Sequence, residues 1–443
     1  AAMPRSSQSL LLARAPLYTR FLAILALVFG STGLLGAAGA AGLGVTWVGR
    51  LTILAVLLRR WVRCQRGLPS RLCCSVKGQP VECSVDGLHR RFLELYAAPG
   101  VASENGSSPE ERCARLQKRL TLEDGQTIAY WDVGPPDART VVLLCNGLGA
   151  RIAGWTAFFD AMHSHWDKWR GCRLVIPEYR GQFASVPLVG EAISVEKSAG
   201  DLAAVAAALG LRQVSLLCWS TGVQVGLQLA LDKPQLVRSM VLIQGTTGEA
   251  LDCILQPLCT VPGMPTMLSF TIGLAPRMLI RNGLRGAIYE RMVRHTSSLV
   301  QVARCALWFF GSDFIPPVAV RYGQDMVQTD AHFSNYCGYA QALGRHRISR
   351  RLPEIRAPAL VVTGTPDFVT PARCSYDMAA LLGGEAELFD DVSGSHYYLF
   401  EEPHKLASKV AAFMERASFV GKEAGEPAGQ PADSAQSSSL RSR

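Results

Sequence analysis

The stretch that most constrains the fold is residues 214–226, with the sequence VSLLCWSTGVQVG. It begins as an apolar, partly β-branched run, breaks at Ser220, and resumes at once with the period of a buried helix. A strand, a sharp turn and a helix in direct succession explain this pattern, because such a turn lifts one hydroxyl out of a sheet. The serine is then either a turn former or helix cap, or a nucleophile that needs a base and oxyanion-binding N–H groups nearby.

Apolar runs and helical patterns alternate on both sides of this turn. Continuous apolar runs are typical of parallel strands buried on both faces. The alternation predicts a mostly parallel, doubly wound α/β sheet built from residues 119–247 and 348–418. The strands are expected at 119–122 and 127–133 (a hairpin), and at 141–145, 173–177, 214–219, 240–243, 359–364 and 386–389.

The pattern changes between residues 248 and 347, where helical segments follow one another without convincing strands. An insertion of this length is too long for a loop of a compact domain, so we expect an all-helical cap over the sheet. Its aromatic residues are expected in the cap core or, alternatively, against an acyl chain; they are Trp308, Phe309, Phe310, Tyr336 and Tyr339. The tail 419–443 is rich in Gly, Pro, Ala, Ser and Gln and is predicted to be disordered.

Two polar residues follow later strands of the predicted sheet. Asp367 comes just after the strand at 359–364, and His396 follows the strand at 386–389. The carboxyl ends of parallel strands form the ligand edge of such a sheet, and Ser220 lies on that edge. Taken singly, the two are also explained as a turn aspartate and a solvated loop histidine. Together, the three residues follow the nucleophile, acid and base order of a known triad architecture.

The predicted sheet and cap resemble the α/β-hydrolase superfamily, in the branch with a helical cap, over roughly two thirds of the chain. The motifs that carry the resemblance are Asn146–Gly149, Tyr179–Gly181, Cys218–Gly222, Thr363–Asp367, Gly394–His396 and Glu402–Pro403. The resemblance implies Ser220 as nucleophile, His396 as general base and then acid, and Asp367 as the group that holds the imidazole tautomer.

The resemblance also implies an oxyanion hole made by the backbone N–H groups of Leu148 and Thr221. The chain departs from the family at two positions beside this site. Asn146 stands where the family usually has histidine, a change that a hole built from backbone should tolerate. Cys218 stands where the first glycine of the G-x-S-x-G motif is expected, so we expect strain or a small shift of the turn.

Other candidate site residues have alternative explanations. Glu249 lies after the strand at 240–243, near the same predicted edge, and is the alternative triad acid. His163 and His165 are two residues apart and diverge on a helix, so surface positions explain them better than a metal pair. Cysteine and histidine spacings of a zinc site are absent from the sequence. We therefore predict no metal site.

The positive charge of the chain is concentrated at its N-terminus. Residues 1–81 contain nine arginines, one lysine and no acidic residue, so the net charge of +9 leaves about −1 for the rest. No basic stripe with interleaved aromatics follows, and nucleic-acid binding is not expected. Residues 1–20 form a basic leader, and residues 21–58 form an apolar segment with Arg50 as its single charge.

The segment 21–58 is long enough to cross a bilayer as one tilted helix or a tight pair of short ones. Its glycines recur every third residue, which suits a helix-packing face or the bend of a hairpin. An acid-free leader rich in Arg and Ser is also typical of an organelle-targeting peptide. Since the arginines after the segment outnumber those before it, the body is expected on the cytosolic side or its organelle equivalent. Residues 59–118 are expected to be a basic, flexible linker in which only Leu88–Tyr96 offers a short helical pattern.

The sequence as a whole predicts a membrane-tethered serine hydrolase that cleaves a carboxylic ester or thioester, with a lipid ester favoured and no cofactor required. The thirteen cysteines are odd in number and mostly lie in apolar runs, which favours a reducing compartment. An acyltransferase on the same fold is the nearest alternative. A catalytically inactive hydrolase fold that serves as a membrane-bound binding or scaffold protein is the third hypothesis.

Overall fold

The computed structural model describes residues 84–98, 101, 106–188, 193–254, 262–309, 316–365, 367–391 and 394–423, together with the short paired strands β1 (Ser75–Val76) and β2 (Gln79–Pro80). All of them belong to the second of two compact units, which divide after Arg71. The predicted leader 1–20 and apolar segment 21–58 lie outside the described residues. Within the described part of the chain, no helix combines the length and apolar character needed to span a membrane.

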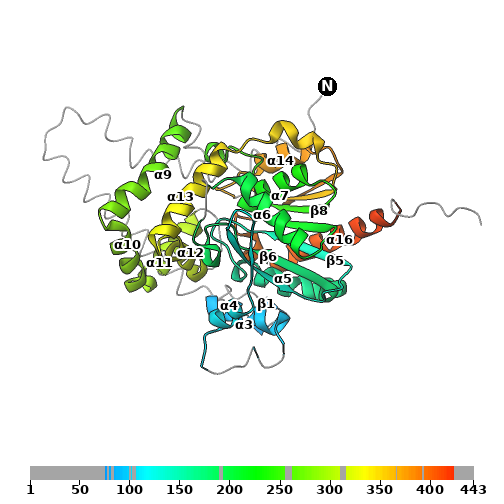
Figure 1. Ribbon diagram of the computed structural model, residues 1–443, viewed down its shortest axis with the longest axis horizontal. Helices are drawn as coiled ribbons and strands as arrows, with labels where there is room; N and C mark the ends of the chain where they lie inside the picture. Colours follow the sequence, from blue (N-terminus) through cyan, green and yellow to red (C-terminus); the bar gives the residue numbers. More distant parts are fainter. Residues whose placement is uncertain are drawn as a thin grey trace, which may run out of the picture. The chain divides into compact units, whose positions relative to one another are not determined.

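A single twisted sheet of eight strands forms the centre of the described chain (Figure 1). Its order is β10-β9-β8-β7-β5-β6-β4-β3, and only the pairs β3–β4 and β4–β6 are antiparallel. The predicted mostly parallel α/β sheet is thereby confirmed. The strands are β3 (Lys118–Thr121), β4 (Thr127–Val133), β5 (Thr140–Cys145), β6 (Cys172–Pro177), β7 (Val214–Trp219), β8 (Val237–Ile243), β9 (Ala359–Gly364) and β10 (Ala386–Asp391).

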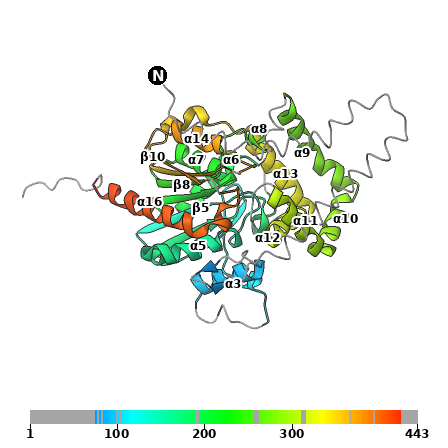
Figure 2. The same ribbon diagram turned by 180° about the vertical axis from the view of Figure 1, so that it is seen from behind.

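Helices cover both faces of this sheet, and each face has its own apolar cluster (Figures 1 and 2). Successive strand residues point to opposite faces, so Leu216 joins one cluster and Leu217 the other. The first cluster includes residues of α5 (Ala153–His165) and α16 (Pro403–Glu423), and the second includes residues of α6 (Val195–Ala208), α7 (Thr221–Asp232) and α14 (Ala372–Leu381). Helices on both faces explain why the central strands read as unbroken apolar runs.

The expectation of a flexible linker over 59–118 does not hold near its C-terminal end. Helix α3 (Val85–Tyr96) buries Leu88, Phe92 and Leu93 in the first cluster. Helix α4 (Pro109–Arg115) starts with a reciprocal capping box between Ser108 and Glu111. Helix α3 contains the helical pattern expected at 88–96, and its three large apolar residues on one face hold this part of the chain against the core.

The segment between the sheet strands β8 and β9 is helical, as predicted. Its described helices are α8 (Ala250–Cys253), α9 (Met264–Arg281), α10 (Leu284–Arg294), α11 (Thr296–Phe309), α12 (Pro316–Met326) and α13 (Asp330–Arg345). An antiparallel bridge between Gly248 and Arg347 closes the base of this cap. Tyr339 of α13 is fully buried, and its hydroxyl donates to the carbonyl of Arg180 at 3.1 Å. Tyr339 therefore joins the cap to the sheet domain.

The predictions for the C-terminal tail and for three cap aromatics concern residues at or beyond the limits of the described chain. The last helix, α16, continues to Glu423, several residues into the tail that we expected to be disordered. Residues 424–443 lie outside the described part of the chain, as do the side chains of Trp308, Phe309 and Phe310.

Candidate active site

Ser220 occupies the sharp turn between β7 and α7. Its backbone has φ 54° and ψ −115°, a left-handed value that non-glycine residues rarely adopt. The Ser220 N–H donates to Ile243 O at 2.9 Å, which ties the turn to the neighbouring strand. A Cβ atom at Gly222 would lie 1.9 Å from the carbonyl oxygen of Cys145, so only glycine fits there. The glycine therefore lets helix α7 start directly against the sheet.

Cys218 fits beneath this turn because the facing helix supplies the missing space. The thiol is fully buried, and a Cβ atom at Gly226 of α7 would lie 2.4 Å from Cys218 Sγ. The sulfur thus fills the volume that a side chain at position 226 would need. A glycine on the helix thus makes the space for Cys218 that the glycine absent from the strand would have left.

The structure brings Ser220, His396 and Asp367 into one chain of hydrogen bonds. His396 Nε2 lies 2.9 Å from Ser220 Oγ, and His396 Nδ1 lies 2.9 Å from Asp367 Oδ2. His396 and Asp367 are both buried, whereas Ser220 is partly exposed. An ionised carboxylate only accepts hydrogen bonds, so His396 Nδ1 carries the proton and Nε2 can accept from the serine hydroxyl. The arrangement can therefore remove a proton from Ser220 Oγ.

Asp367 is held by its own loop. Its Oδ1 accepts from the backbone N–H groups of Val369 and Thr370, at 2.8 and 2.7 Å. Its Oδ2, the oxygen that faces His396, also lies 2.8 Å from the donating hydroxyl of Thr370. These contacts leave Asp367 one orientation, so the carboxylate fixes the position of the imidazole as well as its tautomer.

The loop that carries His396 is held from three sides. Gln244, at the end of β8, donates through Nε2 to the carbonyl of Ser395. Glu401 accepts from the Ser395 N–H at 3.0 Å and from its hydroxyl at 2.6 Å. A Cβ atom at Gly364 would lie 1.7 Å from the carbonyl oxygen of Gly394, so strand β9 and this loop meet through two glycines. The loop that carries His396 is therefore held by residues from the ends of β8 and β9 and by Glu401 of α15 (Tyr398–Glu401).

The loop after β5 carries the predicted oxyanion residue Leu148. Thr221, the second predicted donor, is the first residue of α7, where backbone N–H groups have no acceptor inside the helix. Asn146 orients the loop, because its Nδ2 donates to Pro177 O at 2.6 Å and its Oδ1 accepts from Trp155 Nε1 at 2.8 Å. The side chain of Asn146 is thus used inside the protein, and the backbone of the loop remains for ligand binding.

The alternative acid and the histidine pair lie away from this constellation. Glu249 forms an exposed ion pair with Arg347 at 3.0 Å, while His396 Nδ1 faces Asp367. His165 is exposed at the end of α5, and its Nε2 lies 3.3 Å from Nδ1 of His404 on α16. The described residues contain no group of three or more His, Cys, Asp or Glu side chains that could hold a metal.

Three positioning residues were not identified from the sequence. Thr370 and Gln244 contact the acid and the base loop, and Trp219 donates through Nε1 to His396 O at 3.1 Å. Trp219 and Gln244 lie at the ends of strands that the sequence predicts, and this position is the one sequence feature that could have identified them. Their partners are more than one hundred residues away in the chain, so no local pattern identifies the contacts.

A network of charged side chains joins the oxyanion loop to the cap. The carboxylate of Glu178 is fully buried; burial raises its pKa, and the facing guanidinium of Arg151 at 2.9 Å opposes this shift. Arg151 also reaches Glu110 of α4 at 3.4 Å, and Glu110 pairs with Arg321 of α12 at 3.1 Å. Arg321 in turn binds Asp325, whose pKa burial raises. Helix α4, the loop after β5 and the cap are thereby linked.

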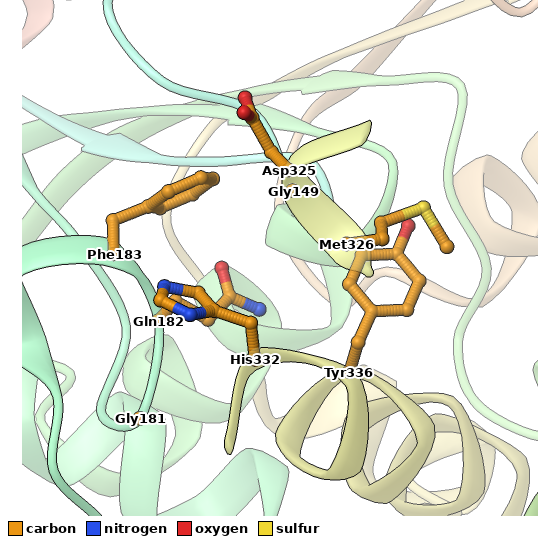
Figure 3. A pocket seen from close by; sticks show the side chains of 8 residues that line it. All are labelled: Gly149, Gly181, Gln182, Phe183, Asp325, Met326, His332 and Tyr336. Carbon is orange, nitrogen blue, oxygen red and sulfur yellow. The ribbon is translucent and has the colours of Figure 1, made fainter. Parts of the chain in front are cut away.

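A small, partly open pocket lies beside the loop after β5, between the sheet domain and the cap (Figure 3). In Figure 3, Gln182 and Phe183 approach it from the loop after β6, and Met326 and Tyr336 approach it from the cap. Tyr336 packs so closely that a Cβ atom at Gly149 would lie 3.1 Å from its ring. The remaining lining residues are Gly149, Gly181, Asp325 and His332.

This fold and this constellation define an α/β hydrolase. A model of the α/β-hydrolase fold family matches residues 140–403, and the chain belongs to that family. Two curated relatives carry the name "Putative carbamate hydrolase RutD": one from Rhizobium rhizogenes is 24% identical over 64% of this chain and 96% of its own length. The other, from Caulobacter vibrioides, is 23% identical over 68% of this chain and all of its own.

The solved structures that resemble this chain include the esterase EaEST from Exiguobacterium antarcticum. It is 18% identical and has a TM-score of 0.50, with 67% of this chain and 99% of that chain covered. Similarity at this level shows the fold alone. Together with the family match, it confirms the predicted α/β-hydrolase superfamily and supports a hydrolase.

Proposed function

We propose that this protein is a serine hydrolase that cleaves a carboxylic ester or thioester through an acyl-enzyme. The observation that carries the proposal is the pair of 2.9 Å contacts that connect Ser220 Oγ, the imidazole of His396 and Asp367 Oδ2. Serine alone is a weak nucleophile, and a histidine held by a carboxylate is the group that activates it.

In the proposed reaction, Ser220 Oγ attacks the carbonyl carbon while His396 Nε2 takes the serine proton. The negative charge on the carbonyl oxygen is stabilised by the backbone N–H groups of Leu148 and Thr221. His396 then gives its proton to the departing alcohol or thiol, and the acyl-enzyme remains. Water enters, loses a proton to His396 and attacks the acyl group, and release of the acid restores Ser220.

A carbamate, like an ester, has a carbonyl carbon that a serine can attack. The RutD relatives are named putative carbamate hydrolases. An ester remains the proposed substrate, because a lipophilic ester suits the apolar side chains of Phe183, Met326 and Tyr336 beside the oxyanion loop. An acyltransferase would use the same acyl-enzyme and pass the acyl group to an alcohol or thiol acceptor instead of water.

We also propose that the protein is tethered to a membrane by the apolar segment 21–58, with the hydrolase domain on the cytosolic side or its organelle equivalent. The support is the length of this segment and the excess of arginine on its C-terminal flank.

A fluorophosphonate probe, which reacts with activated serines, tests the nucleophile. The full chain should be labelled, and Ser220→Ala and His396→Ala should each abolish labelling, because both the nucleophile and its base are needed. Glu249→Gln is the matched control, since it removes a carboxylate that contacts Arg347 rather than His396. A folded wild-type protein that takes no label would contradict the proposed activity and favour the inactive scaffold.

Product analysis separates hydrolysis from transfer. A p-nitrophenyl ester should release p-nitrophenol and free acid, with little change when alcohols or thiols are added. Faster turnover and an acylated acceptor in their presence would instead assign an acyltransferase. A parallel assay with a p-nitrophenyl carbamate compares the two carbonyl classes on the same enzyme.

A further inference from the structure

Helix α9 of the cap exposes a stripe of large apolar side chains. Met267, Phe270, Leu274 and Met278 are 55%, 68%, 38% and 52% exposed. Their spacing of three, four and four residues places them on one face of the helix. Most of the large hydrophobic residues that are exposed in the described chain belong to the cap. We call these four residues of α9 the cap stripe.

The part of the cap stripe formed by Met267 and Met278 is opposite the face with which α9 packs on α13. Gln341 of α13 donates through Nε2 to Ser269 O at 3.1 Å. A Cβ atom at Gly273 would lie 2.3 Å from the same amide nitrogen, so this side of α9 is pressed against α13. At about 100° per residue, Ser269 and Gly273 lie on the far side of the helix from Met267 and Met278. Met267 and Met278 therefore point away from α13.

Helices α9 and α10 carry exposed positive charge, and two of the arginines are on α9 itself. Arg277 and Arg281 of α9 and Arg291 and Arg294 of α10 are all exposed. Among the described residues of α9, α10 and α11, Glu290 is the single acidic side chain. Helices with an apolar face and arginine beside it bind anionic lipid surfaces. Acidic residues at those positions would be repelled by the lipid charge, and neutral residues would add no electrostatic attraction.

We propose that α9 lies in the plane of an anionic phospholipid bilayer, with the cap stripe inserted at the boundary between headgroups and acyl chains. In such helices the apolar face is buried about 5–10 Å into this boundary, and arginine side chains reach the phosphates. Figures 1 and 2 both show α9 and α10 at the side of the cap away from the sheet. The inference does not depend on the proposed reaction.

Quenching by brominated lipid tests this placement. Phe270→Trp puts an indole into the cap stripe, and the full chain is placed in vesicles of phosphatidylcholine and phosphatidylserine with bromines on the acyl chains. Subtraction of the wild-type signal removes the eight native tryptophans. We expect the fluorescence added by position 270 to be lost in brominated vesicles and kept in unbrominated ones. Arg277→Gln with Arg281→Gln should reduce that loss, and omission of phosphatidylserine should do the same.

Leu388→Trp is the matched control, because Leu388 is 41% exposed on strand β10 and does not belong to the cap. Its added fluorescence should survive bromination. Equal quenching at positions 270 and 388, or none at position 270, would overturn the proposal. If wild-type protein dimerises in sedimentation runs while Phe270→Asp stays monomeric, the stripe is an interface between two copies, and the lipid assignment is wrong. The readout is independent of catalysis, so an inactive Ser220→Ala protein should give the same result.

Discussion

The hydroxyl of Thr370 donates a 2.8 Å hydrogen bond to Oδ2 of Asp367, the same carboxylate oxygen that lies 2.9 Å from Nδ1 of His396. The same hydroxyl lies 2.8 Å from the carbonyl oxygen of Gln244 and 3.3 Å from Nδ1 of His396, so Thr370 contacts the acid, the base and the end of β8 together. It is a positioning residue, placed three residues after the acid by the tight loop that follows β9.

Thr370→Val should lower kcat/KM for a soluble ester by roughly tenfold or more, since a hydrogen bond to a charged group contributes about 1.5–3 kcal/mol. Thr370→Ser keeps the hydroxyl and should restore most of the activity. The measurement is steady-state kinetics with both variants at equal folded concentration. Loss of activity in the serine variant as severe as in the valine variant would assign Thr370 a packing role only.

Gly226→Ala should destabilise the protein, because its Cβ atom would lie 2.4 Å from Cys218 Sγ. Overpacking of this kind costs about 1–3 kcal/mol in unfolding free energy, measured by denaturant titration. Adding Cys218→Ala removes the sulfur and should recover most of the loss. Gly200→Ala on α6 is the control, since nothing lies within 4 Å of its Cβ position. If the double variant is no more stable than Gly226→Ala alone, the exchange of space between the two positions is refuted.

Arg151→Met should lower the unfolding free energy by about 3–5 kcal/mol, since it leaves the buried carboxylate of Glu178 without its cation. Arg151→Met combined with Glu178→Gln should be less damaging, because no charge is then buried alone. Thermal unfolding of the two variants gives the comparison. Equal destabilisation by the single and double variants would show that packing by Arg151, and not its charge, matters at this site.

Stability should fall as the pH is lowered below about 6.5, because burial lowers the pKa values of His89 and His346 below 6.5. Unfolded histidine takes up a proton near 6.5, whereas these two resist protonation in the folded state. At these two positions the unfolded state therefore binds more protons in this range, so their contribution to stability is full above it and lost below it. Unfolding free energy measured between pH 7.5 and about 5 should show this slope.

Replacing His346 by Gln should flatten that slope, because the buried imidazole whose pKa is lowered is then absent. A slope that stays as steep in this variant would remove His346 as a source of the pH dependence.

Deletion of residues 1–60 should release an active protein into the soluble fraction, because the deletion removes the predicted apolar segment. Fractionation and p-nitrophenyl ester turnover measure the two properties. A truncated protein that still sediments with vesicles would show that segment 21–58 is not the sole attachment and would point to the cap stripe.

Several features were readable from the sequence, because they depend on residues close together in the chain. The strand–turn–helix at Ser220 follows from a change of apolar period within thirteen residues, and the cap follows from a hundred residues of helical pattern between two strands. Asp367 and His396 were found because each directly follows a recognisable apolar strand. Parallel strands end at a common edge, so local position already implied proximity.

Other features were decided by contacts between distant parts of the chain. Three contacts exist only in the folded sheet. They are the packing of Cys218 against Gly226, the pairing of His396 with Asp367 instead of Glu249, and the hydrogen bond from Gln244 to the His396 loop. Helix α3 also depends on distant contacts. A short amphipathic helix is stabilised mainly when its apolar face packs against the core of the protein. Sequence periodicity specifies which face of an element is buried, but packing decides which distant residues meet there.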